Sequence, residues 1–205
     1  MNRLKLQKNK TMHLLPLKFE AALLQRDFNN IVRNWGNYFN MYAYGKWSQL
    51  PLRAMISKFH FLATGDDGAL YRNTKLLAQS PYFQKVLESL DCEISEVRLL
   101  RWEPFSDKKE LSLAEATFFT GNARLYVPII TNSLTKISAF NKTGRMVAGE
   151  CWLTKCTPEI INQGSTNAVF LTVDVKVSSA LNILFDKEEV EKPLNKAPFN
   201  SIARS

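Results

Sequence analysis

Histidine is the scarcest chemically versatile residue in this chain of 205 residues, because only His13 and His60 occur. This scarcity excludes an HExxH zinc motif and most other metal or acid–base sites that depend on histidine. Cysteine is almost as rare, with three residues, and the spacing of Cys151 and Cys156 is not that of a CxxC pair. We therefore expect buried cysteines rather than a disulfide scaffold or a redox site, and a cytoplasmic protein.

Several other features are missing. No apolar run approaches the ~18 residues that a membrane helix needs, and the basic start lacks the apolar stretch of a signal peptide. The chain has neither a glycine-rich phosphate loop nor a GxSxG motif. Lysine and arginine outnumber acidic residues by 27 to 19, but only Lys46 lies among the aromatic residues of 35–47. We accordingly expect no membrane and no nucleic-acid partner.

The hydrophobic content of 45% is enough for a folded core. The first ten residues contain no acid and no apolar period, and the end of the chain is polar with scattered prolines. This pattern predicts a disordered basic tail over 1–12, a folded domain over 13–186 and a flexible tail over 187–205. His13 is expected to be solvated and His60 to be structural.

Hydrophobic periodicity divides the domain in two. Helical spacing predicts a helix over 18–34, and Ser80-Pro81 predicts the start of another that runs to Leu90, while 35–53 reads as irregular. After residue 93 the period changes to two, with Pro128 indicating an edge or bulge and Gly144 a left-handed turn. Strands are expected over 97–102, 124–131, 134–140, 145–147, 151–154 and 169–177. Short, regularly spaced strands predict a β-sandwich or barrel behind an N-terminal helical region.

Motifs in this strand-rich half have a family resemblance. They are RLYVPIITN at 124–132, AGECW at 148–152, NQG at 162–164 and VFLTVD at 169–174. Together they resemble the aspartyl/asparaginyl β-hydroxylase family, and most closely its small bacterial members that hydroxylate free amino acids such as proline. The resemblance extends over residues 14–185. It implies a mainly β, cupin-like jelly-roll barrel (a double-stranded β-helix) with N-terminal helices packed outside.

The resemblance also implies Fe(II) and 2-oxoglutarate, held by a His-x-Asp pair, a second histidine and an arginine. In this chain the His-x-Asp positions are Leu111 and Leu113, directly after Glu110. Pro158 is at the second histidine and Ala168 at the arginine that would bind the co-substrate carboxylate. None of these side chains offers a metal donor or a cation, so we expect no metal, no cofactor and a pseudo-enzyme.

Three alternatives stay open. The first is a non-catalytic protein that binds an amino acid, a peptide or a partner protein, as a homo-oligomer or beside an active homologue. The second is a metal-independent enzyme using Tyr126, Glu159, Glu110 or a cysteine as acid or base. The third is an Fe(II) oxygenase with ligands from elsewhere. The residues expected around the pocket are Arg53, Trp47, Arg124, Tyr126, Leu111, Leu113, Pro158 and Ala168.

Overall fold

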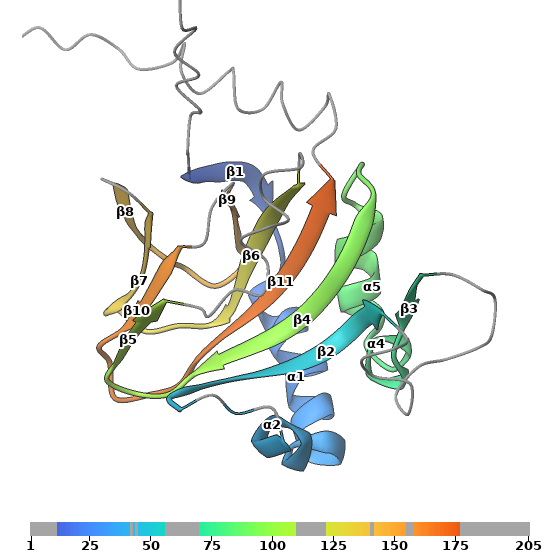
Figure 1. Cartoon of the computed structure of the whole chain (residues 1–205), viewed down its shortest axis with the longest axis horizontal. Coiled ribbons are helices and arrows are strands. Elements are labelled where there is room, and N and C mark those ends of the chain that lie inside the picture. The colour runs from blue at the N-terminus through green and yellow to red at the C-terminus, as the bar shows by residue number, and fades with distance from the viewer. Residues whose placement is uncertain are drawn as a thin grey trace, which may run out of the picture.

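The computed structural model describes residues 12–41, 43, 45–55, 70–109, 122–139, 142–154 and 158–176 (Figure 1). The helices are α1 (Ala21–Trp35), α2 (Asn37–Met41), α4 (Lys75–Ala78) and α5 (Pro81–Glu88). The first strands are β1 (Met12–Lys18), β2 (Trp47–Met55), β3 (Tyr71–Asn73), β4 (Ile94–Trp102), β5 (Ser106–Lys109) and β6 (Asn122–Ile130). The remaining strands are β7 (Thr135–Ala139), β8 (Lys142–Arg145), β9 (Glu150–Thr154), β10 (Glu159–Asn162) and β11 (Ala168–Lys176).

The order of the strands defines a jelly roll. A seven-stranded sheet has the order β1-β9-β6-β11-β4-β2-β3, and it faces a four-stranded sheet of order β5-β10-β7-β8. The strands β4 to β11 therefore divide equally between the two sheets, and every pairing between them is antiparallel. This is the double Greek key of a jelly-roll barrel. It confirms the mainly β, cupin-like fold class predicted from the sequence.

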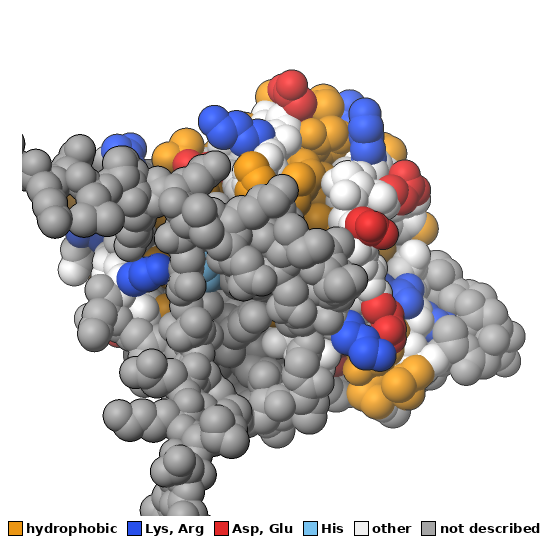
Figure 2. All heavy atoms as spheres, turned by 90° about the horizontal axis from the view of Figure 1, so that it is seen from above, with side chains coloured by type: hydrophobic (Ala, Val, Ile, Leu, Met, Phe, Trp, Pro, Cys, Tyr) orange, Lys and Arg blue, Asp and Glu red, His pale blue; other side chains and the backbone are white. Residues whose placement is uncertain are grey.

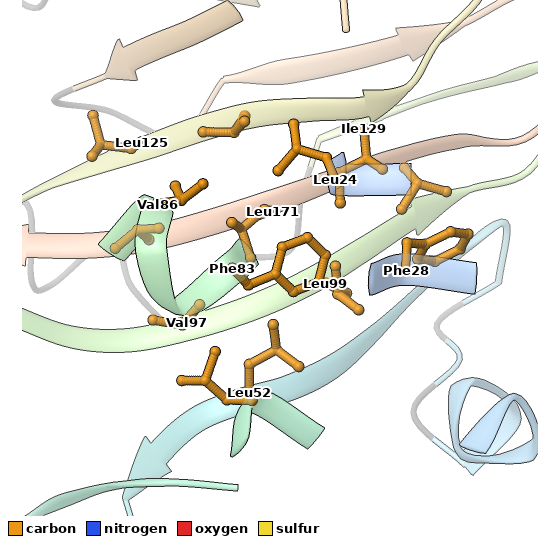
Figure 3. Packing of buried hydrophobic residues seen from close by; sticks show 14 of the residues in the cluster. Leu24, Phe28, Leu52, Phe83, Val86, Val97, Leu99, Leu125, Ile129 and Leu171 are labelled. Carbon is orange, nitrogen blue, oxygen red and sulfur yellow. The ribbon is translucent and has the colours of Figure 1, made fainter. Parts of the chain in front are cut away.

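The N-terminal region contributes both helices and strands. The helices cover the outer face of the seven-stranded sheet, where α1 and α5 pack on the alternating apolar residues of β4, β6 and β11 (Figure 3). The prediction of helices outside the barrel is thus confirmed. However, β1, β2 and β3 join the large sheet itself, so this region is not only an outer layer.

The pairing of β1 with β9 corrects the expectation for His13. Met12 lies opposite Thr154 and His13 opposite Leu153, and both β1 side chains are buried. His13 is therefore not solvated, because strand pairing covers it. Met12, the last residue of the predicted tail, belongs to β1; residues 1–11, 177–205 and His60 lie outside the described residues.

A second apolar cluster fills the barrel between the sheets. The alternation of side chains along each strand sends every other residue of β4, β6, β9 and β11 into this interior. The buried members of this inner cluster are Met12, Trp47, Leu100, Trp102, Tyr126, Ile137, Ala139, Met146, Trp152, Ile160, Ala168 and Phe170.

Some of the local predictions from the sequence are confirmed by the structure and others are wrong. The helices begin and end within a few residues of their predicted limits, and the pairing of β6 with β11 is irregular beside Pro128, as a bulge predicts. The prediction of an irregular stretch over 35–53 is wrong, because this stretch contains α2 and most of β2. Gly144 lies within β8 rather than in a left-handed turn. Its missing side chain instead admits the Trp152 ring, since a Cβ would lie 2.3 Å from a ring carbon.

Among the described residues, no helix combines the length and apolar character needed to cross a membrane.

Candidate ligand site in the barrel

The two ends of the barrel interior differ in chemistry. At one end the chain turns between β4 and β5, between β6 and β7 and between β10 and β11; we name this the turn end. The opposite end, where Arg98, Arg124 and Asp174 lie, is named the charged end. In Figure 1 the charged end is uppermost, where the arrow of β11 finishes.

Aromatic rings fill the turn end. Trp47 stacks on Trp102 with ring centroids 5.6 Å apart, and Phe170 meets Trp102 edge-on at 5.8 Å. Ala168 is the cross-strand partner of Trp102 and is fully buried. The position that the family resemblance assigns to the co-substrate arginine is therefore enclosed by apolar rings.

The register between β5 and β10 determines where Pro158 lies. Glu159, the first residue of β10, pairs with Lys109, the last residue of β5. Pro158 is buried just before β10, close to the end of β5 from which Glu110, Leu111 and Leu113 continue. Those three residues lie outside the described residues, so only one half of the predicted metal position has a structure here.

Glu159 does not point into the interior. Ile160 belongs to the inner cluster, and successive residues of a strand face opposite sides. The half-buried Glu159 side chain is consequently on the outer face of the small sheet. Tyr126, by contrast, is fully buried in the inner cluster, between its cross-strand partners Thr172 and Trp152. The structure thus separates these two predicted acid–base candidates.

A network of charged side chains crosses the charged end. Arg124 on β6 and Asp174 on β11 are cross-strand partners, and the guanidinium binds the carboxylate through Nε and Nη2, with Nη2 2.9 Å from Oδ2. Arg98 on β4 donates from Nη2 to the same Oδ2 at 3.0 Å and also to Glu96. Arg124 is only 1% exposed at its side chain, whereas Arg98, Glu96 and Asp174 are 14–18% exposed.

These contacts perturb the protonation of two groups. Burial alone would raise the pKa of Asp174, but the guanidiniums of Arg124 and Arg98 outweigh it and hold this pKa below its ordinary value. Burial raises the pKa of Tyr71 on β3, and the nearby carboxylates of Glu96 and Asp174 raise it further. At neutral pH the network therefore contains an ionised Asp174 and a protonated phenol.

Two other predicted groups have ordinary structural surroundings. Arg53 donates from Nη1 to Asn73 Oδ1 at 2.9 Å, at the edge of the large sheet formed by β2 and β3. Burial raises the pKa of the Cys151 thiol to about 12 and that of Cys92 to about 11. Neither thiol ionises near neutral pH, which disfavours an acid–base role for these two cysteines; Cys156 lies outside the described residues.

Sequence reasoning missed most of this network. Of its members only Arg124 was among the predicted site residues; Arg98, Glu96, Asp174 and Tyr71 were not. One signal was available: Asp174 is the lone acid in the most strictly alternating strand of the chain. A charge on the inward phase of such a strand needs a partner, but the sequence does not say which strands are neighbours.

The described residues do not fit iron and 2-oxoglutarate. They contain no group of three or more His, Cys, Asp or Glu side chains placed to hold a metal ion. Pro158 has no donor atom, and Ala168 offers no cation to a carboxylate.

No family model and no curated protein sequence matches the chain. Solved structures of similar fold include a non-heme monooxygenase, ThoJ, as its nickel complex, with 9% identity over 83% of this chain and 75% of that one, at a TM-score of 0.47. The collagen prolyl hydroxylase of Paramecium Bursaria Chlorella virus-1 has 8% identity over 84% and 99% of the two chains, at 0.46. A Pseudomonas putida prolyl-4-hydroxylase has 10% identity over 84% and 95%, at 0.46. Because these values are low, we rest the jelly-roll assignment on the strand order.

Proposed function

We propose that this chain is a catalytically degenerate member of the oxygenase fold, a pseudo-enzyme related to the aspartyl/asparaginyl β-hydroxylases. It binds an amino acid or the end of a peptide at the charged end of the barrel. The observation that supports this most is the aromatic packing around Ala168. An oxygenase needs space and a cation for 2-oxoglutarate at that depth, and here Trp47, Trp102 and Phe170 fill it.

The charged end supports the choice of ligand. Arg98, Glu96 and Asp174 bring both signs of charge to one place and keep partial exposure. A ligand with a carboxylate and an ammonium group matches such a site, because each group meets an opposite charge. Acidic and basic side chains are also intermixed on the described part of the face at this end (Figure 2). The cytoplasmic location, and association with a protein partner, an active homologue or a second copy, remain predictions.

The absence of oxygenase chemistry is tested directly. We expect anaerobic calorimetric titration with Fe(II) to show no stoichiometric binding, and an assay of succinate release from 2-oxoglutarate with each amino acid to show no turnover. Restoring ligands with Leu111→His, Leu113→Asp and Pro158→His should recover metal affinity without turnover, because the rings around Ala168 remain. Tight one-to-one iron binding with succinate formation by the unmodified protein would overturn the proposal.

Ligand binding needs a separate measurement. A thermal-shift screen of amino acids and short peptides should find ligands that raise Tm, and calorimetry should then show weaker binding by Arg98→Gln. Arg145→Gln, an exposed arginine on β8, is the matched control and should bind as the unmodified protein does. If a substrate is consumed and Tyr126→Phe abolishes the reaction, the chain is instead a metal-independent enzyme.

A further inference from the structure

Two residues with buried hydrogen-bond donors are neighbours on adjacent strands near α2, on the face of the large sheet that is turned away from the barrel. Ser48 on β2 and Arg101 on β4 are cross-strand partners. Both point to the outer face, because Leu50 and Leu99, two positions away along their strands, belong to the apolar cluster between this face and the helices. Partner residues in such a pair have Cβ atoms about 5 Å apart.

Neither donor has an acceptor. Ser48 is 2% exposed and its Oγ makes no hydrogen bond, and the Nε of Arg101 is also buried without a partner. None of the ion pairs among the described residues includes Arg101. The guanidinium instead lies over the ring of Phe39, with Cζ 4.9 Å from the ring centroid. Unsatisfied buried donors are uncommon in folded proteins, and two on neighbouring strands indicate a missing acceptor.

We propose that Arg101 and Ser48 form a binding site for a small carboxylate. The Nε–Nη edge of a guanidinium binds a carboxylate through two parallel hydrogen bonds, and the Ser48 hydroxyl supplies a third. A monoanion balances the single positive charge of Arg101, whereas a dianionic phosphate would leave one charge unpaired. The ring of Phe39, fully buried on α2, holds the plane of the guanidinium.

The surroundings limit the size of the ligand. Ser48 bridges to Ala43, so the strand that carries the hydroxyl is paired on both edges, to Ala43 and to β4. Because Oγ and Nε are both covered, the proposed ligand is a small group such as formate, acetate or the end of a longer acid. This site and the charged end of the barrel lie on opposite faces of the large sheet. A test of the site is therefore independent of the proposed function.

The test follows the buried N–H of Arg101. In a proton–nitrogen correlation spectrum of the full chain, its Nε–H signal is identified as the one lost in Arg101→Gln. Titration with sodium formate or acetate, at ionic strength held constant with sodium chloride, should shift that signal saturably and raise Tm. The dissociation constant obtained from the rise in Tm should increase about tenfold or more in Arg101→Gln and several-fold in Ser48→Ala. Arg145→Gln should bind as the unmodified chain does.

Ser48→Ala also separates binding from folding. It removes an unsatisfied hydroxyl, so the ligand-free variant should be as stable as the unmodified protein while it binds formate less tightly. Tighter binding of a short peptide with a free C-terminus than of its amide would support the site and identify a chain end as the carboxylate source. Equal responses to formate and chloride, a stronger response to phosphate, or no loss in Arg101→Gln would each overturn the proposal.

Discussion

The two ends of the barrel interior are stabilised by different interactions. At the turn end, Trp47, Trp102 and Phe170 bring large apolar areas into contact, and stability follows from the area removed from water. At the charged end, Arg124 is buried as deeply as those rings, and its bonds to Asp174 help to compensate for the lost hydration. A packed apolar end tolerates small changes, whereas a buried ion pair does not tolerate the loss of one partner.

The largest effect is expected from breaking this ion pair. Asp174→Ala removes the carboxylate that binds the buried Arg124, and should lower the free energy of unfolding by about 3–5 kcal/mol in urea titrations. Glu93→Gln, which alters the exposed pair of Glu93 with Lys176, is the matched control and should change little. The double variant Arg124→Met with Asp174→Leu should recover most of the loss. A small effect of Asp174→Ala would show that water reaches Arg124. It would contradict the view that the charged end depends on its buried ion pair.

The turn end contains a buried polar side chain, Asn162, whose loss should cost less than that of Asp174. Asn162 is fully buried; its Nδ2 donates to the carbonyl oxygens of Glu103 and Thr166, each at 2.9 Å, and its Oδ1 accepts from Asn132. Asn162→Ala leaves these groups unsatisfied but uncharged, so we expect a loss of about 2–3 kcal/mol. The neighbouring, exposed Gln163→Ala should be nearly neutral. A loss larger than that of Asp174→Ala would reverse the order of the two ends.

The ends also differ in how far the sequence predicted them. The NQG motif and the strict alternation of 169–177 placed β11 and the turn before it correctly. The charged network was missed because its members are single charges on separate strands, and only the sheet order makes Arg124 and Asp174 neighbours. Strand β2 was missed because Pro51 interrupts its pattern, which the irregular pairing with β4 accommodates. Glu159 was placed near the pocket because the sequence does not give the phase of so short a strand.

Acid should weaken the charged end selectively. The pKa of Asp174 is lower in the folded than in the unfolded chain, so its ionisation adds stability above the unfolded pKa, near 4, and this stability is lost as the pH falls through the folded value. As the pH falls below about 5, the unmodified protein should lose more of its free energy of unfolding than Asp174→Asn does. Chemical unfolding at a series of pH values measures this difference, and parallel curves for the two proteins would assign the acid sensitivity to other carboxyls.

The smallest effect concerns the stacked tryptophans of the turn end. The indole N–H of Trp102 is buried without an acceptor, whereas Trp47 has a further interaction. Replacing either ring by phenylalanine removes a similar apolar area, but Trp102→Phe also removes an unsatisfied donor. Trp102→Phe should therefore be less destabilising than Trp47→Phe by about 1 kcal/mol, as measured by urea unfolding. The reverse order would mean that water satisfies the Trp102 N–H, and that the turn end is less dry than its aromatic packing indicates.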